Sequence, residues 1–289
     1  MKEKKAVVVF LIIVLMLSTI VDILWIKGGE AASKSGISVI LMWCPAIAAF
    51  ISRGIYYKKE KILGWNKCKI YFILIAIFAP VIYLVLSYGI YWLVNKGSFT
   101  GDLNTLSSVA STYTSKTSHQ SIVTVITIII AIPSSILAAM GEEIGWRGFL
   151  LPQMIKIWNI KAAITISGLI WAVWHMPIMI AGLYDSGTPI WYQLPMFTIS
   201  VLSIAVIISV LRVKSNSIWP AIILHASHNY FDQAIFGTLT KSTNKAYFVG
   251  ETGIITVIAM ILVTMGIVML FKKSKIANSD VHEPVNALN

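Results

Sequence analysis

The stretch IYFILIAIFAPVIYLVLSYGIYWLV, residues 70–94, contains no charged side chain. An α-helix needs about 20 apolar residues to cross the hydrocarbon core of a bilayer, so this stretch is long enough to span one. Its apolar residues are continuous, whereas a transmembrane β-strand alternates apolar and polar residues. Inside lipid every backbone N–H and C=O must bond within the protein, which favours helices. The stretch therefore predicts a membrane-spanning helix.

Similar apolar stretches recur along the whole chain. Of its 289 residues, 57% are hydrophobic and 12% are charged, whereas soluble domains carry about 25% charged residues. Residues 1–273 are expected to form a single domain, and residues 274–289 a short disordered cytoplasmic tail. We predict an all-α fold, a polytopic transmembrane helical bundle with about eight spans, at 6–26, 36–52, 70–94, 121–141, 162–181, 194–211, 217–236 and 252–271.

The net charge of +11 follows this predicted topology. With the N-terminus inside, the cytoplasmic segments hold 17 Lys and Arg residues and the outer segments hold six. The positive-inside rule then places both termini in the cytoplasm. We expect an integral protein of a bacterial plasma membrane whose basic segments are attracted to anionic lipid, and no binding of nucleic acid.

Ionisable residues inside the predicted spans form three groups, and the first follows residues 121–141. An ionisable residue in a membrane helix costs about 2.5–3.5 kcal/mol, so each needs a reason. In the sequence GEEIGWRG, Glu143 and Arg147 are four residues apart and can pair on a helix. Glu142 points about 100° away and keeps a carboxylate free, as a general base requires. The alternative is a charged helix end that leaves the membrane.

The second and third groups contain imidazoles. His175 lies in the apolar sequence WAVWHMP, although a single His is more often a hydrogen-bonded core residue than a catalyst. The third group shares one helical face. The alternative for this group is a seam of hydrogen bonds between helices, worth about 0.6 kcal/mol per bond. Four polar side chains exceed what a seam needs and favour a water-filled site; they are His225, His228, Asn229 and Asp232.

Together the three groups resemble a known family. The patterns E-E-x-x-x-R at 142–147, W-x-x-x-H at 171–175 and H-x-x-x-N at 225–229 look like the three motifs of the CPBP intramembrane proteases. That family includes the type II CAAX prenyl endopeptidases and proteins linked to bacteriocin processing or self-immunity. The motifs occur in the family's order, on separate predicted helices, and span about 90 residues. The family has Phe where this chain has Trp171, which exchanges one aromatic residue for another.

The resemblance implies an intramembrane endopeptidase that hydrolyses a peptide bond of a membrane-associated protein or peptide. Carried over by position, Glu142 and His175 would activate water, and His225 and Asn229 would stabilise the oxyanion. A hydrolase needs these two functions, a base on water and donors aimed at developing negative charge. The remaining candidates would shape the site or bind substrate; they are Glu143, Arg147, Trp171 and His228.

Metal dependence and two other functions are alternatives. Glu142, His175 and His225 are the residues that could bind zinc with a water as fourth ligand, but the H-E-x-x-H motif of zincins is absent. The resemblance also supports a glutamate-dependent mechanism, so no cofactor is favoured. A non-catalytic immunity protein that binds a peptide would use the same residues. A proton-coupled transporter is a further alternative, although paired half-repeats are not visible.

Counting along the predicted helices leaves one conflict. Glu142 and His225 fall near the inner face, whereas His175 lies 14 residues beyond Lys161, or about 21 Å along a straight helix. We therefore expect the helix of Glu142 to continue past Arg147, and the helix of His175 to start later or to tilt. The site would then lie in the cytoplasmic half of the bilayer, in a cavity open to the cytoplasm.

Overall fold

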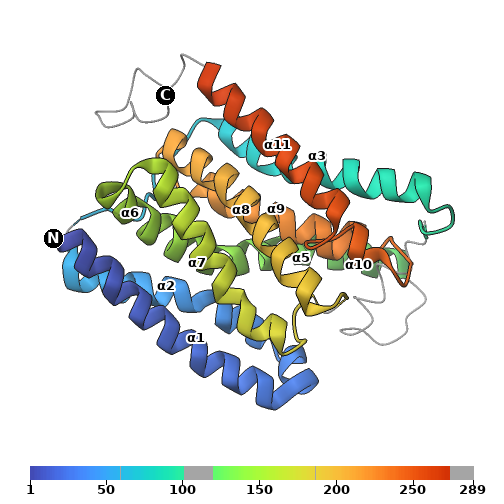
Figure 1. Cartoon of the computed structure of the whole chain (residues 1–289), viewed down its shortest axis with the longest axis horizontal. Coiled ribbons are helices and arrows are strands. Elements are labelled where there is room, and N and C mark those ends of the chain that lie inside the picture. Colours follow the sequence, from blue (N-terminus) through green and yellow to red (C-terminus); the bar gives the residue numbers. More distant parts are fainter. Residues whose placement is uncertain (59, 101–119, 186, 274–289) are drawn as a thin grey trace.

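The computed structural model describes residues 1–58, 60–100, 120–185 and 187–273, so the predicted tail at 274–289 lies outside it. Within these ranges the chain is helical, and its long helices run side by side (Figure 1). Two segments, η1 and η2, are π-helices. The elements are α1 (Lys2–Lys34), α2 (Ile37–Tyr56), α3 (Ile70–Val94), α5 (Gln120–Glu143), η1 (Ile144–Leu150), α6 (Leu151–Ile157), α7 (Ile160–Ile180), α8 (Ile190–Ser215), α9 (Trp219–Asn229), η2 (Tyr230–Phe236), α10 (Lys245–Phe248) and α11 (Ile254–Lys273).

Each of the eight predicted spans overlaps a helix, and the prediction of an all-α membrane bundle is confirmed. In the described part of the chain six helices are long and apolar enough to cross a bilayer: α1, α2, α3, α7, α8 and α11. Since α9 has only 11 residues and continues as η2, the count of eight spans stays a prediction.

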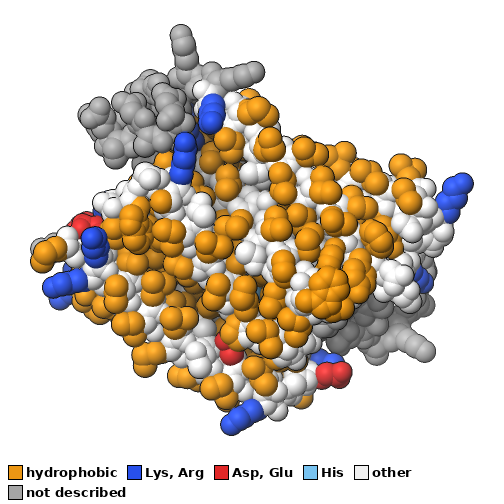
Figure 2. All heavy atoms as spheres, in the orientation of Figure 1, with side chains coloured by type: hydrophobic (Ala, Val, Ile, Leu, Met, Phe, Trp, Pro, Cys, Tyr) orange, Lys and Arg blue, Asp and Glu red, His pale blue; other side chains and the backbone are white. Residues whose placement is uncertain are grey.

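The outer surface of the bundle is apolar. Figure 2 shows hydrophobic side chains across the visible face, with most Lys and Arg side chains toward its edges. On α1, Leu15 and Met16 are more than half exposed, as is Leu93 at the end of α3. Large apolar side chains on a bundle surface suit contact with lipid, which is as apolar as they are.

Helix α9 is packed between other helices. It lies against α3, α5 and α8, while α1 packs on α2 and α7 on α8. The polar stripe predicted at 225–232 therefore faces protein on several sides. The beginning of α1, the whole of α6 and the end of α11 lie on the left side of the molecule in Figure 1.

The predicted end of the fourth span at residue 141 is wrong, because the helix continues through η1 and α6 to Ile157. The expected continuation of this helix past Arg147 is confirmed. For the helix of His175 a later start or a tilt was expected, and the later start is excluded because α7 begins at Ile160. Glu142 precedes Ile157 by the same number of positions as His175 follows Ile160. Both side chains are thus about 20 Å from the same turn, at one level of two neighbouring helices.

Along the helix axes, α9 begins beside η1 and not beside the end of α6. The third motif therefore lies at the same height in the bundle as Glu142 and His175. Arg212, near the end of α8, donates from Nε to the backbone carbonyl of Arg147 at 3.1 Å. Ile218, just before α9, has its side chain beside Gly148. His225 follows two helical turns later, far enough to reach Glu143.

Candidate active site

The helix that carries the first motif packs closely on α2 through two glycines. A Cβ at Gly141 would lie 2.6 Å from the carbonyl oxygen of Met42, and one at Gly145 would lie 2.8 Å from that of Pro45. Small residues four apart allow such approach of membrane helices. Because the glycine face lies against α2, Glu142 and Glu143 project elsewhere into the bundle, where they are 1% and 0% exposed.

Glu143 joins the first motif to the third. Its Oε1 accepts hydrogen bonds from Nη1 of Arg147 and from Nδ1 of His225, both at 2.9 Å. The predicted pair of Glu143 and Arg147 is therefore present, whereas its contact with His225 was not foreseen. The bond fixes the ring of His225 and leaves Nε2 as its other polar atom.

Trp171 connects Glu142 to the rest of the site. Its indole Nε1 donates to Oε2 of Glu142 at 2.5 Å. The guanidinium carbon of Arg147 lies 4.1 Å from the indole ring centre, in a cation–π contact. The ring of His225 meets the indole edge-on at 5.2 Å between centroids. Glu142 hydrogen-bonds neither histidine directly, so Trp171 is the residue that connects Glu142 to the second and third motifs, beside the direct bond between Glu143 and His225.

The hydrogen bond of His175 defines its tautomer. Nδ1 lies 3.1 Å from the backbone carbonyl oxygen of Trp171, one turn earlier. A carbonyl only accepts, so Nδ1 carries a proton, and in the neutral ring Nε2 would be the acceptor. The ring is held edge-on by Trp174 and Phe197, at 4.7 and 5.2 Å between centroids. The orientation of the His175 ring is thus fixed, with Nε2 as its other polar atom.

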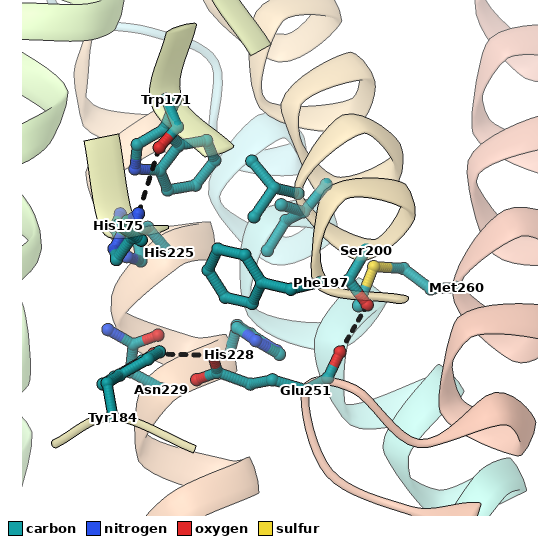
Figure 3. Close-up of a pocket in the computed structure, with 12 residues that line it drawn as sticks. Trp171, His175, Tyr184, Phe197, Ser200, His225, His228, Asn229, Glu251 and Met260 are labelled. Atoms are coloured by element: carbon teal, nitrogen blue, oxygen red, sulfur yellow. Dashed lines mark hydrogen bonds between the residues drawn. The ribbon is translucent and has the colours of Figure 1, made fainter. Parts of the chain in front are cut away.

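A cavity lies between α7, α8, α9 and the segment before α11 (Figure 3). It offers about 30 Å³ to the centres of water molecules, and one water needs about 10–15 Å³, so water fits. Five predicted site residues line it: Trp171, His175, His225, His228 and Asn229. Glu142, Glu143 and Arg147 do not line it, and Glu142 lies one hydrogen bond behind Trp171.

Several cavity residues were not predicted from the sequence, among them Tyr184, Phe197, Ser200 and Glu251. The Tyr184 hydroxyl and the Ser200 hydroxyl both donate to Glu251, to Oε2 and to the backbone carbonyl respectively, each at 2.5 Å. Glu251 directly precedes the last predicted span, and a carboxylate at that position was the available signal. The aromatic residues look like ordinary membrane residues in the sequence.

One loop carboxyl has a perturbed pKa. Asp185 lies between α7 and α8 with a left-handed backbone, φ 49°. The pKa of Asp185 is raised to about 7, first by burial and also by the negative charge of Glu251, while a hydrogen bond with Thr252 acts in the opposite direction. The group therefore titrates near neutral pH.

The fold and the site define the class of protein. It is an integral membrane helical bundle with carboxylates, imidazoles and a carboxamide gathered beside a cavity in its core. Residues 124–231 match the family described as type II CAAX prenyl endopeptidase Rce1-like, and this segment contains all eight predicted site residues. The predicted resemblance to the CPBP family is confirmed for the segment that carries the site.

A similar protein from an archaeon also matches about half of the chain. The chain is 29% identical over 143 residues to the CAAX prenyl protease 2 of Methanococcus maripaludis. The alignment covers 48% of this chain and 50% of the relative, so the chain spans about half the length of the relative that it matches.

Proposed function

We propose that this protein is an intramembrane endopeptidase that cleaves a membrane-associated protein or peptide. The observation that carries the proposal is the meeting of the three motifs at Trp171, which binds Glu142 through its indole, His175 through its carbonyl and His225 through its ring. The matching family and the named relative support the same activity.

In the proposed reaction a water is held by Nε2 of His175 and gives a proton to Glu142. Oε2 of Glu142 accepts from Trp171, so Oε1 is the oxygen available as base. The water oxygen bonds to the scissile carbonyl carbon, and Glu142 then passes the proton to the leaving nitrogen as the C–N bond breaks. Glu142 must reach the water beside Trp171 when substrate is bound, since catalytic contacts are often longer before binding.

His225 and Asn229 are proposed to stabilise the oxyanion. They are one turn apart on α9 and line the same cavity. His225 donates from Nε2 if both ring nitrogens carry protons. Buried charge favours that form, because Glu142 and Glu143 are then balanced by Arg147 and an imidazolium. Each donor of this kind contributes about 10²–10³ in kcat.

We propose a reaction without metal at this centre. The zinc alternative requires Glu142, His175 and His225 to place one ligand atom each around a common point. Among the described residues, the one group of three such side chains whose ligand atoms lie within 4.8 Å of one another is a different set. The proposed reaction therefore uses no zinc ion at Glu142, His175 and His225.

The proposed setting is a bacterial plasma membrane with both termini in the cytoplasm. The beginning of α1 and the end of α11 lie on the same side of the bundle in Figure 1, which agrees with that topology. On this side Lys2 pairs with Glu60 at 2.9 Å, and the ammonium of Lys2 covers the ring of Tyr57.

The test uses the full chain in nanodiscs with a library of internally quenched peptides, some of them lipidated. Glu142→Gln keeps an acceptor for Trp171 but removes the base, so cleavage should fall at least about 100-fold while the melting temperature stays the same. Glu30→Gln, at a side chain 92% exposed, is the matched control and should cleave normally. Full activity of Glu142→Gln would refute the proposal. Protection against a peptide toxin that survives this substitution would favour the non-catalytic immunity function instead.

A further inference from the structure

A second group of ionisable side chains lies at the far side of the cavity, where His228 and Glu251 line it and Asp232 lies beside them. His228 and Asp232 are one turn apart on α9 and η2, and Glu251 reaches them from the segment before α11. One ligand atom from each lies within 4.8 Å of the others. Figure 3 shows His228 and Glu251 together below Phe197, on the side of the cavity away from Trp171. No step of the proposed hydrolysis uses this group.

His228 and Asp232 are each held by a neighbour that leaves another ligand atom free. The Tyr83 hydroxyl lies 2.8 Å from Nδ1 of His228, and the Tyr88 hydroxyl donates to Oδ1 of Asp232 at 2.8 Å. Nε2 of His228 and Oδ2 of Asp232 make no hydrogen bond with the described residues, although the two side chains are only 7% and 4% exposed. Outer partners of this kind orient metal ligands.

The carboxylates of this group have no ion-paired cation in the described part of the chain, although Lys245 is near enough to Asp232 to interact with it electrostatically. Asp232 and Glu251 form no ion pair with any described Lys or Arg, although both are at least nine-tenths buried. The nearest candidate, Lys245, donates instead to two backbone carbonyls just after η2. The Glu251 oxygens accept from Tyr184 and Gln233, both neutral donors, and each oxygen keeps a second lone pair. Buried charges are normally paired or coordinate a metal, because an isolated ion loses its hydration.

We propose that His228, Asp232 and Glu251 bind one divalent cation of the zinc or manganese class. Two carboxylates balance its charge, and one imidazole with two carboxylates suits these ions. Ligand atoms around a tetrahedral ion of this kind are about 3.4 Å apart. The three ligand atoms lie within 4.8 Å of one another, so the group must contract by up to about 1.4 Å to bind it. Remaining positions would hold water in the cavity. The ion would tie η2 to the segment before α11, and it would lie one turn from Asn229.

The test measures zinc binding by the purified full chain. Protein stripped with chelator is dialysed against buffered Zn²⁺, and bound zinc is measured by mass spectrometry. The wild type should bind one zinc per chain and melt at higher temperature with zinc present. Asp232→Asn and Glu251→Gln should each lower the affinity at least 100-fold and abolish the shift. Tyr88→Phe, which removes an outer partner, should lower it about 10–100-fold.

The control variants are Glu142→Gln and His175→Ala, which should bind zinc as the wild type does. Sub-stoichiometric binding by the wild type, or unchanged binding in both Asp232→Asn and Glu251→Gln, overturns the proposal. Loss of zinc in His175→Ala with retention in Asp232→Asn would place the metal at the other centre and also overturn it. Since the readout is bound metal, failure here is distinguishable from failure of the proposed peptidase activity.

Discussion

Arg147→Met should destabilise the protein by about 3–5 kcal/mol, because it leaves a buried carboxylate without its cation. Arg147 is 2% exposed and Glu143 is 0% exposed, and their 2.9 Å ion pair is shielded from water. The substitution also removes the cation–π contact of Arg147 with Trp171, worth up to about 2 kcal/mol when desolvated. His225 still donates to Glu143, which places the expected loss toward the lower end of the range.

The pair is best measured by a double-mutant cycle. Glu143→Gln removes the charge that Arg147 compensates, so the double variant should be less destabilised than the sum of the two single variants. We expect a coupling energy of about 2 kcal/mol, within the range measured for contacting residues. Unfolding is followed by tryptophan fluorescence in mixed micelles as the fraction of SDS is raised.

A surface arginine provides the control for this cycle. Arg53 is partly exposed and donates to the backbone carbonyl of Glu60. Arg53→Met should change stability by less than about 0.5 kcal/mol, as surface substitutions usually do. The reasoning is refuted if Arg147→Met lowers the free energy of unfolding no more than Arg53→Met does. It is also refuted if the loss in the double variant equals the sum of the two single losses, because the buried ion pair would then not stabilise the helix that carries Glu143 and Arg147.

The glycine contacts, the oxyanion site and the loop carboxyl give three further predictions. Gly145→Ala should lower the melting temperature, because its Cβ would collide with the backbone of Pro45. The control is Gly54→Ala, whose Cβ meets nothing within 4 Å, and it should be neutral or stabilising. Equal melting temperatures of the two variants would contradict the close packing at Gly145. Asn229→Ala should lower kcat about 10²–10³-fold with little change in KM, measured on the best library peptide, and a pure KM effect would remove it from the oxyanion site. The pKa of Asp185 is raised to about 7 in the folded protein, mainly by burial. As the pH rises from about 4 to 7, the unfolded chain releases the Asp185 proton while the folded chain keeps it, so the protein loses stability over this range. Asp185→Asn should therefore raise the melting temperature more at pH 8 than at pH 5, and an equal effect at both would count against this titration.

Much of the fold could be predicted from local sequence because lipid imposes a strong constraint. A run such as 70–94 is helical almost wherever it lies, and it is the helix α3 with the same bounds. The end of the fourth span was harder to place. Glu142, Glu143 and Arg147 look like a helix leaving the membrane, whereas the structure buries all three. Arg147 pairs with Glu143 on the same helix, and the two carboxylates are bonded to Trp171 and His225 on other helices. Such pairing depends on residues far away in the sequence and leaves no local pattern.

The members of the site could be predicted, but several of their contacts could not. The spacing of Glu143 and Arg147 gave their ion pair, because helix geometry alone brings residues four apart together. Two contacts depend instead on how α7 and α9 pack against the helix of the first motif. They are the bond of His225 to Glu143 and the bond of Trp171 to Glu142. Glu251 joins the cavity from a segment with no periodic pattern, so its charge was the only signal available, and it was not predicted.

Trp158 and Asn159 form a tight turn between α7 and the continuous helix of α5, η1 and α6. This helical hairpin sets the relative height of the functional groups on its two arms. Its two arms have equal length between the turn and the paired functional groups, Glu142 on one arm and His175 on the other. Extending a single arm by one position would slide one group past the other by about 1.5 Å and rotate it by about 100°. Length changes in this hairpin should be tolerated only when both arms change together, by whole turns. Chains of different length can therefore share this chemistry while keeping the symmetry of the two arms.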